Sequence, residues 1–430
     1  MIRRLAFLLI GVLAVAGGIV VGVRVLGGDA CAVETVEDPR SPLQSVARMK
    51  AAPDEDRDAL ATALGSAPEP FGELRAGLDY YYDQYLHLYG VNGGVLAWTN
   101  DNAPVTYLDD GTLKPRWSLR PATKRTAWDT SQDRFLLLGL SKSAPVTVSS
   151  HDLRSGEQKW CAELSGKQRA GEPVGTAFLP GGDVVVALPA TRDRIQVSRL
   201  AGDDGKELWS RTVTAGRADF VDLVGDVLVV GGEEEFRLAA APSGKQVDNA
   251  VVTLDPSSGR QVVAWGGGDA GLAHVVGATG STMVVTTRLG EGVDLAAVDD
   301  QLAERWTVRL PDGAYEATLR GDVVLTRTRT SLDAYDAGSG KVLWRRALPQ
   351  DRTYFPYGFA LGQMPSLDGT HVLVPTTSSL EILDVTDGTS RSVPLPTDGV
   401  SSTYWPYQLL ATPKHLGVLT NTGTAVVTRD

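Results

Sequence analysis

The chain has 430 residues and is acidic, with 41 Lys and Arg against 52 Asp and Glu and a formal net charge of −11. This balance argues against a protein that binds nucleic acid through phosphate contacts, because that affinity needs clustered Lys and Arg. Hydrophobic residues make up 43 % and charged residues 22 %, which is typical of globular chains. With only two cysteines, we expect no disulfide to hold the fold together.

An uncharged apolar run near the N-terminus predicts a membrane anchor. Arg3 and Arg4 precede nineteen residues without a charge, from Leu5 to Val23. As a helix this run spans roughly 28 Å, close to the thickness of the bilayer core. The positive-inside rule then places residues 1–4 in the cytoplasm and the bulk of the chain outside. We predict an uncleaved transmembrane helix at 5–26 and a single-pass protein of the cell membrane.

A cleaved signal peptide is the alternative. Ala30 and Ala32 form a possible cleavage site, but the apolar run exceeds a usual signal-peptide core and Arg24 interrupts the approach to the cut. Cys31 raises the possibility of a lipoprotein, although the preceding Gly28, Asp29 and Ala30 lack the aliphatic-then-small pattern of a lipidation site. We expect Cys31 to be an unpaired cysteine in a linker.

Residues 27–79 have a composition that is typical of a stalk between a membrane and a folded domain. Five prolines interrupt the segment, and short helices are expected at 43–52 and 54–64. We predict a semi-ordered, partly helical linker between membrane and domain.

From about residue 80 to residue 430, short runs of Val, Leu and Thr alternate with Gly, Asp and Ser. Eight of these runs are short and almost wholly apolar, as expected for strands that are buried on both faces. We predict that they are the inner strands of successive sheets. They are Val95–Asn100, Phe135–Leu140, Val184–Pro189, Val227–Gly232, Met283–Arg288, Val323–Thr328, His371–Thr376 and Leu416–Asn421.

A second pattern follows most of these strands: an Asp, a turn with Gly, and then a Trp. Asp side chains accept hydrogen bonds from the turn backbone, and Gly supplies a positive φ. The Trp is expected to lie on an outer strand and pack between adjacent sheets, so that its role is structural. The six repeat tryptophans are Trp117, Trp160, Trp209, Trp265, Trp306 and Trp344; the seventh repeat has Val393 instead.

The spacing of these tryptophans predicts a β-propeller. Successive positions differ by 43, 49, 56, 41 and 38 residues, and periods of about 40–50 with four strands each are typical of propeller blades. We predict an all-β chain of eight four-stranded blades, with seven as the alternative. Residues 74–82 would complete the last sheet and close the ring.

The turn sequence, clearest at Asp336–Trp344 and again at Gly205–Trp209, resembles the repeat of quinoprotein-type propellers, which are pyrroloquinoline-quinone-like repeat proteins. The resemblance covers residues 80–430. Quinone-dependent dehydrogenases of this kind use a catalytic Asp, a calcium site and adjacent cysteines, whereas this chain has only Cys31 and Cys161. We therefore expect no pyrroloquinoline quinone. The same repeat occurs in non-enzymatic outer-membrane-assembly lipoproteins.

Together these patterns predict a non-catalytic, membrane-tethered binding or scaffold module for a protein or another envelope component. The alternatives are a quinone-dependent oxidoreductase and the sensor domain of an envelope signalling system. We expect no catalytic and no metal-binding residues, because the five histidines lack metal-ligand spacing. Whether the chain has any enzymatic activity stays open.

Four weaker patterns allow a structural role beside a functional one. The glycine-rich stretch 266–271 has no helix after it, so an inter-blade loop is favoured over a nucleotide site. Residues 233–235, three glutamates, are expected in a solvated loop. Arg327 and Arg329 share a strand face and either bind an anion, face the channel or pair with neighbouring acids. Two aromatic stretches offer a partner-binding rim. The rim residues are Tyr354, Phe355, Tyr357, Tyr404, Trp405 and Tyr407.

Overall fold

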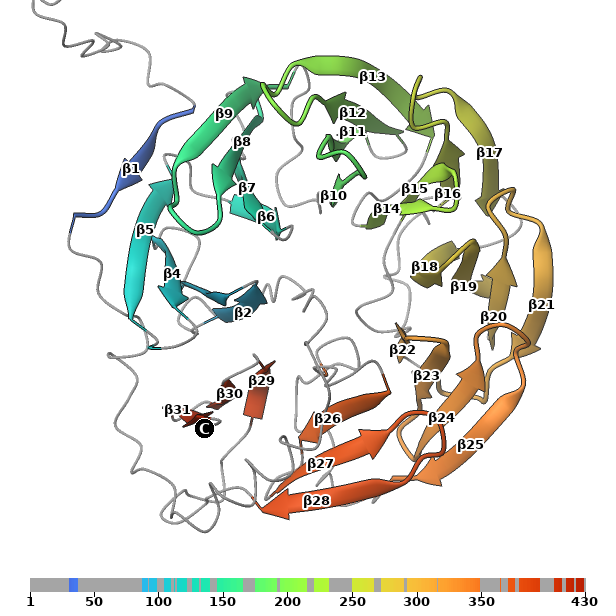
Figure 1. Ribbon diagram of the computed structural model, residues 1–430. Coiled ribbons are helices and arrows are strands. Elements are labelled where there is room, and N and C mark those ends of the chain that lie inside the picture. The colour runs from blue at the N-terminus through green and yellow to red at the C-terminus, as the bar shows by residue number, and fades with distance from the viewer. Residues whose placement is uncertain are drawn as a thin grey trace, which may run out of the picture.

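The computed structural model of the chain is all-β in the part that it describes (Figure 1). The description covers residues 31–37, 87–91, 93–98, 104–109, 112, 114–121, 126–130, 133–139, 145–164, 175–191, 194–214, 220–231, 250–266, 272–289, 292–314, 316–348, 364, 370–375, 379–394, 406–411, 415–420 and 423–428.

The described strands form eight antiparallel sheets, which we number in chain order. Sheet 1 holds β1 (Val33–Thr35), β2 (His87–Val91), β3 (Gly94–Trp98), β4 (Val105–Asp109) and β5 (Pro115–Pro121). Sheet 2 holds β6 (Thr126–Thr130), β7 (Arg134–Gly139), β8 (Thr147–Asp152) and β9 (Gln158–Glu163). Sheet 3 holds β10 (Gly175–Phe178), β11 (Val184–Thr191), β12 (Arg194–Leu200) and β13 (Glu207–Thr214). Sheet 4 holds β14 (Phe220–Val224), β15 (Val227–Gly231), β16 (Ala250–Leu254) and β17 (Gln261–Gly266).

The second half of the chain repeats the same arrangement. Sheet 5 holds β18 (Leu272–Thr279), β19 (Thr282–Leu289), β20 (Gly292–Val298) and β21 (Glu304–Arg309). Sheet 6 holds β22 (Glu316–Arg320), β23 (Val323–Arg327), β24 (Ser331–Asp336) and β25 (Val342–Ala347). Sheet 7 holds β26 (His371–Pro375), β27 (Ser379–Asp384) and β28 (Ser390–Pro394), and sheet 8 holds β29 (Pro406–Ala411), β30 (His415–Thr420) and β31 (Gly423–Thr428).

The sheets stand around one central axis, which is the arrangement of a propeller (Figure 1). The innermost strands of neighbouring sheets contact one another, as β10 does with β14 and β18 with β22. β2 also contacts β29, so the first and last sheets are neighbours. Each sheet buries its apolar faces against the next sheet, and the core is therefore a series of clusters between sheets, such as the one around Val230 and Trp209.

The eight apolar runs are not the innermost described strands, except in sheet 7, which corrects the prediction from sequence. They correspond to β3, β7, β11, β15, β19, β23, β26 and β30, and in seven of the sheets another strand lies nearer the axis. The second strand has a neighbour at both edges and a sheet on both faces, so it is the most buried. In sheet 4, β15 is buried throughout, whereas Asp222 and Leu223 of the innermost β14 are partly exposed.

A disulfide joins Cys31 to Cys161, so the expectation of an unpaired Cys31 and of no structural disulfide is wrong. The bond connects Cys31, two residues before β1, to β9 of sheet 2, across 130 residues of chain. β1, which lies inside the predicted stalk, pairs with the outer edge of β5 as a fifth strand of sheet 1. In both the disulfide and the pairing of β1 with β5, the two partners are far apart in sequence. The presence of two cysteines does not show that they lie close together in the fold.

The predicted transmembrane helix at 5–26, the cleavage site at Ala30, the predicted helices at 43–52 and 54–64 and the closing strand at 74–82 lie outside the described residues. Within the described residues, no helix has the length and apolar character needed to cross a membrane.

Candidate functional site

The repeat tryptophans join each sheet to the next one. In five junctions, Nε1 of a Trp on β5, β9, β13, β21 or β25 donates a hydrogen bond to a backbone carbonyl in the turn before the outermost strand of the following sheet. The pairs are Trp117 with Leu153 at 3.0 Å, Trp160 with Gly202 at 2.9 Å, Trp209 with Pro256 at 3.0 Å, Trp306 with Ala337 at 3.0 Å and Trp344 with Val385 at 2.8 Å. Trp265 lies in β17, but its side chain is outside the described part of the structure.

The turn glycine lets the indole ring approach the backbone. Gly340 has φ of +69°, and a Cβ there would lie 2.6 Å from Cε3 of Trp306. Gly205 repeats the arrangement against Trp160, with φ of +72° and 2.5 Å. Only glycine combines a left-handed backbone with room for a ring at this distance. Each junction is therefore specified by two residues about forty positions apart.

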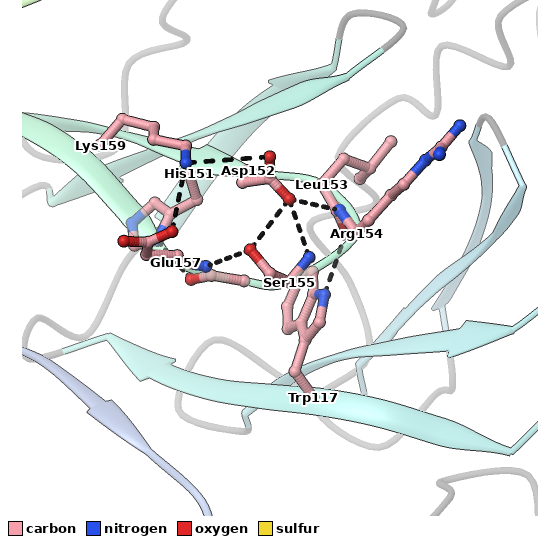
Figure 2. Close-up of polar contacts among 9 residues, drawn as sticks. Trp117, His151, Asp152, Leu153, Arg154, Ser155, Glu157 and Lys159 are labelled. Carbon is pink, nitrogen blue, oxygen red and sulfur yellow. Dashed lines mark hydrogen bonds and ion pairs between the residues drawn. The ribbon is translucent and has the colours of Figure 1, made fainter.

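The Asp of the turn fixes its shape (Figure 2). Oδ1 of Asp152 accepts hydrogen bonds from the amides of Arg154 and Ser155, at 3.1 and 2.9 Å, and from the Ser155 hydroxyl. The amide of Gly156 donates to the carbonyl of Asp152 at 2.9 Å, which closes the turn. The bond from the Ser155 amide is the main reason that the pKa of Asp152 lies below its usual value. This carboxylate is engaged within its own turn and is not poised for acid–base chemistry.

At the junction of sheets 1 and 2, four rings form a stacked column. Tyr107 stacks on Trp117, with ring centroids 5.5 Å apart, Trp117 stacks on Phe135 at 5.1 Å, and Phe135 stacks on His151 at 4.9 Å. The His151 ring also lies 3.1 Å from the Gly156 carbonyl through Nδ1 and 2.9 Å from the Ser149 hydroxyl through Nε2. Burial lowers the pKa of His151, so the neutral imidazole is favoured in the folded protein.

Two junctions add an arginine to the tryptophan. Nη1 of Arg134 donates to the same Gly202 carbonyl as Trp160, at 2.6 Å. Nη1 of Arg199 donates to the Pro256 carbonyl at 2.7 Å, and its guanidinium also pairs with Asp183. Both lone pairs of these carbonyls are therefore used, one by the indole and one by the guanidinium.

Arg327 and Arg329 have different surroundings. Nη2 of Arg327 lies 3.0 Å from Oε1 of Glu316, and both side chains are buried. Of the three roles that the sequence leaves open for Arg327, pairing with a neighbouring acid is therefore the one that the structure shows. Arg329 follows the end of β23 and is exposed, so the two arginines do not form one site.

The remaining sequence candidates are only partly covered by the described residues. Nε2 of His371 lies 3.6 Å from Oδ2 of Asp384 on the adjacent strand. Among the described residues, no group of His, Cys, Asp or Glu has the arrangement of a metal site. Residues 233–235 and 267–271 lie outside the described residues, as do Tyr354, Phe355, Tyr357, Tyr404 and Trp405 of the aromatic rim. Tyr407 lies in β29, but its side chain is not described.

Sequence reasoning missed three features of the described structure. The Cys31–Cys161 bond could have been considered from the pair of cysteines, but no pattern places them together. The Glu316–Arg327 pair depends on the register of β22 against β23, where the two residues are directly opposite. The burial of His151 was also missed, because a histidine that precedes the turn Asp and lacks metal-ligand spacing shows no pattern that indicates burial.

The ring of sheets and the Asp–Gly–Trp junctions define a propeller of the pyrroloquinoline-quinone-like repeat class. Residues 83–247 and 247–402 match the family described as outer membrane protein assembly factor BamB. Because these two matches cover well over half of the chain, the protein belongs to this family. No curated protein matches the chain.

Solved structures with similar backbones are distant in sequence. The crystal structure of BamB from Moraxella catarrhalis is 13 % identical, with 83 % of this chain and 98 % of that chain covered and a TM-score of 0.49. The Dos1 propeller is 8 % identical, with 79 % and 88 % covered and a TM-score of 0.48. A europium-containing methanol dehydrogenase is 13 % identical, with 67 % and 72 % covered and a TM-score of 0.40. Family membership therefore rests on the two matched stretches of sequence.

The two cysteines do not have the arrangement that the resemblance implies beside a quinone. The resemblance would require adjacent cysteines beside the quinone. Here the two cysteines come from β9 and from the segment before β1, and they are bonded to each other at the outer edge of sheets 1 and 2 (Figure 1).

Proposed function

We propose that this protein is a non-catalytic binding and scaffold module that is tethered to the cell membrane and acts outside the cytoplasm on an envelope protein. The observation that carries the proposal is the match of residues 83–247 and 247–402 to the family of outer membrane protein assembly factors. The junction chemistry supports it, since the indoles, turn carboxylates and buried charges described above serve contacts between and within sheets.

The disulfide supports an extracytoplasmic location. Disulfides form and persist in oxidising compartments and are rare in the cytosol. The bond also bears on the tether, because Cys31 cannot carry a lipid thioether and a disulfide on the same sulfur. Cleavage after Ala32 would remove Cys31 and with it the bond to Cys161. The uncleaved apolar segment at 5–26 is the tether consistent with both facts.

The tether and location are tested by fractionating cells that express the full chain and mapping its peptides without reduction. We expect the protein in the membrane fraction, digested by protease outside intact spheroplasts, with a Cys31–Cys161 linked peptide. A soluble product that begins after Ala32, or a lipid-modified Cys31, would contradict the proposed tether.

We propose further that each of the eight sheets is one blade of an eight-bladed ring. Sheets 2–6 each have four strands, and sheets 7 and 8 each have three described strands. Residues 74–82 remain our prediction for the fourth strand of sheet 8. An experimental structure with seven blades would contradict this count.

The partner-binding surface is proposed at the aromatic rim, because Tyr and Trp are enriched in the buried centres of protein interfaces. The test compares cross-linked pull-downs of the wild type with a variant carrying Tyr354→Ser, Tyr357→Ser and Trp405→Ser. The matched control carries Leu208→Ser and Leu343→Ser, which change exposed apolar side chains on outer strands. We expect one envelope protein to be lost only with the rim variant. Equal recovery from both variants would contradict the rim.

We also propose that the chain functions without pyrroloquinoline quinone, on the grounds given above for its cysteines. Calorimetry of the purified protein with the quinone and Ca²⁺ tests this point. No heat of binding is expected, and tight stoichiometric binding would instead support a quinone-dependent oxidoreductase.

A further inference from the structure

The segment that leads to the N-terminus is fixed to the outer edge of the propeller at two points. β1 pairs with β5, with Val33 opposite Pro121 and Thr35 opposite Leu119. Two residues before β1, Cys31 is bonded to Cys161 on β9 of the next sheet. Towards the N-terminus, the described part of this segment therefore ends at Cys31, at the outer edge that β5 and β9 form (Figure 1).

The connection from this point to the proposed membrane span is short. Five peptide steps separate residue 26, the end of the span, from Cys31, and at about 3.6 Å each they cover at most about 18 Å. A compact body of about 350 residues has a radius of gyration of about 20 Å. The connection is shorter than this radius, so Cys31 and the strands beside it lie close to the bilayer surface.

We propose that the outer edge formed by β1, β5 and β9, which we call the tethered edge, rests against the lipid bilayer, and that the disulfide fixes this orientation. This inference rests on the proposed membrane anchor at 5–26. The opposite side of the ring, which includes β25, faces away from the membrane and is left open to soluble partners (Figure 1).

The tethered edge is held near lipid by chain length and not by charge. Its exposed cations each have an acidic partner: Arg116 with Asp109, Arg120 with Glu34 at 3.0 Å, and Lys159 with Glu157 at 3.2 Å. This balanced surface lacks the excess of Lys and Arg that attracts anionic lipid. The orientation is therefore expected in zwitterionic vesicles and at high salt alike.

The test places a fluorescent amino acid at position 159 or at position 343 of the full chain in phosphatidylcholine vesicles. These positions are a matched pair, since both lie on outermost strands, on opposite sides of the ring, with 45 % of the Lys159 side chain and 43 % of Leu343 exposed. Quenching by nitroxide-labelled lipid headgroups is expected to be several-fold stronger at 159 than at 343. Equal quenching in protein that floats with the vesicles would overturn the orientation, whereas failure to float would overturn the anchor itself.

Two variants separate the disulfide from the length of the connection. A twenty-residue Gly/Ser insertion after Leu26 keeps the bond but lengthens the connection, and it is expected to equalise quenching at the two positions without changing flotation. The double variant Cys31→Ser and Cys161→Ser leaves β1 held by strand pairing alone and is expected to reduce the difference. If the insertion variant kept the full difference in quenching between the two positions, the short connection would not fix the orientation. If the Ser double variant kept that full difference, the disulfide would not fix it.

Discussion

The indole Nε1 of Trp117 donates a hydrogen bond to the carbonyl of Leu153, 36 residues later in the chain and on the next sheet, at 3.0 Å. Both residues are buried, so neither the donor nor the acceptor has water as an alternative partner. Because the same contact recurs at four other junctions, the ring is held by many equivalent bonds between neighbouring sheets. Loss of one of them should weaken a single junction and leave the others in place.

Substitution of Trp117 by Phe tests the value of this bond. Phe keeps an aromatic ring between Tyr107 and Phe135 but removes the N–H, which leaves the Leu153 carbonyl buried without this donor. We expect a loss of about 2–3 kcal/mol in the free energy of unfolding, from the unpaired acceptor and the lost volume. Urea denaturation followed by circular dichroism measures it.

Trp344→Phe is the matched control, because Trp344 makes the same bond to Val385 but its ring is only partly buried. Its loss should be smaller, about 1 kcal/mol. If Trp344→Phe destabilised the protein more than Trp117→Phe, burial would not be what gives the bond its value.

Two glycines in the same turn allow two costs, a left-handed backbone and a close ring contact, to be separated from the general effect of an added side chain. Gly340→Ala places a Cβ at φ of +69° and 2.6 Å from the Trp306 ring. We expect it to lower stability by about 3 kcal/mol, since the left-handed backbone costs about 1 kcal/mol and the ring must also move. Thermal unfolding is the measurement.

Gly338→Ala is the control within the same turn. A Cβ there meets only Oδ1 of Asp336, at 3.5 Å, and the residue is exposed. Its effect should stay within about 0.5 kcal/mol. Equal effects of the two substitutions would contradict the role given to the ring contact.

The repeat was predictable because its chemistry is local. Asp336, Gly340 and Trp344 lie within nine residues. The turn needs a hydrogen-bond acceptor at one position and a positive φ at another, and the residue types Asp and Gly at these positions indicate both. The carbonyl that accepts each indole hydrogen bond could not be predicted from the sequence, because every residue has a carbonyl. The Val385 carbonyl that Trp344 binds is 41 residues away. The order of strands within a sheet was misjudged because the greatest apolar content marks the second strand. The disulfide and β1 were missed because their partners are far away in sequence.

The buried pair of Glu316 and Arg327 offers a test of a structural against a ligand-binding role. Glu316→Leu would leave the buried guanidinium without this carboxylate, and we expect a loss of about 3 kcal/mol or more. The double variant with Arg327→Met should recover most of this loss, because an apolar pair of similar size replaces the ion pair. Chemical denaturation of the two variants measures the difference. A double variant as unstable as the single one would show that the two side chains do not act as a pair.

His151 predicts a specific loss of stability in weak acid. Its pKa in the folded protein is lowered from 6.5 by burial, so the unfolded chain takes up the proton first as the pH falls. The contribution is fully present above pH 6.5, declines as the pH drops below 6.5, and stops declining once the folded protein is also protonated. For one group the slope is at most about 1.4 kcal/mol per pH unit.

The measurement is the urea midpoint between pH 8 and about pH 5.5, above the range in which ordinary carboxylates titrate. His151→Gln keeps a polar side chain beside Ser149 but carries no proton that titrates there, so this variant should be less stable at pH 8 and lose the decline below pH 6.5. The two stability curves should therefore converge as the pH falls. Parallel curves for the wild type and His151→Gln would assign the pH dependence to another group, and the stacked column of Trp117, Phe135 and His151 would then be insensitive to protonation.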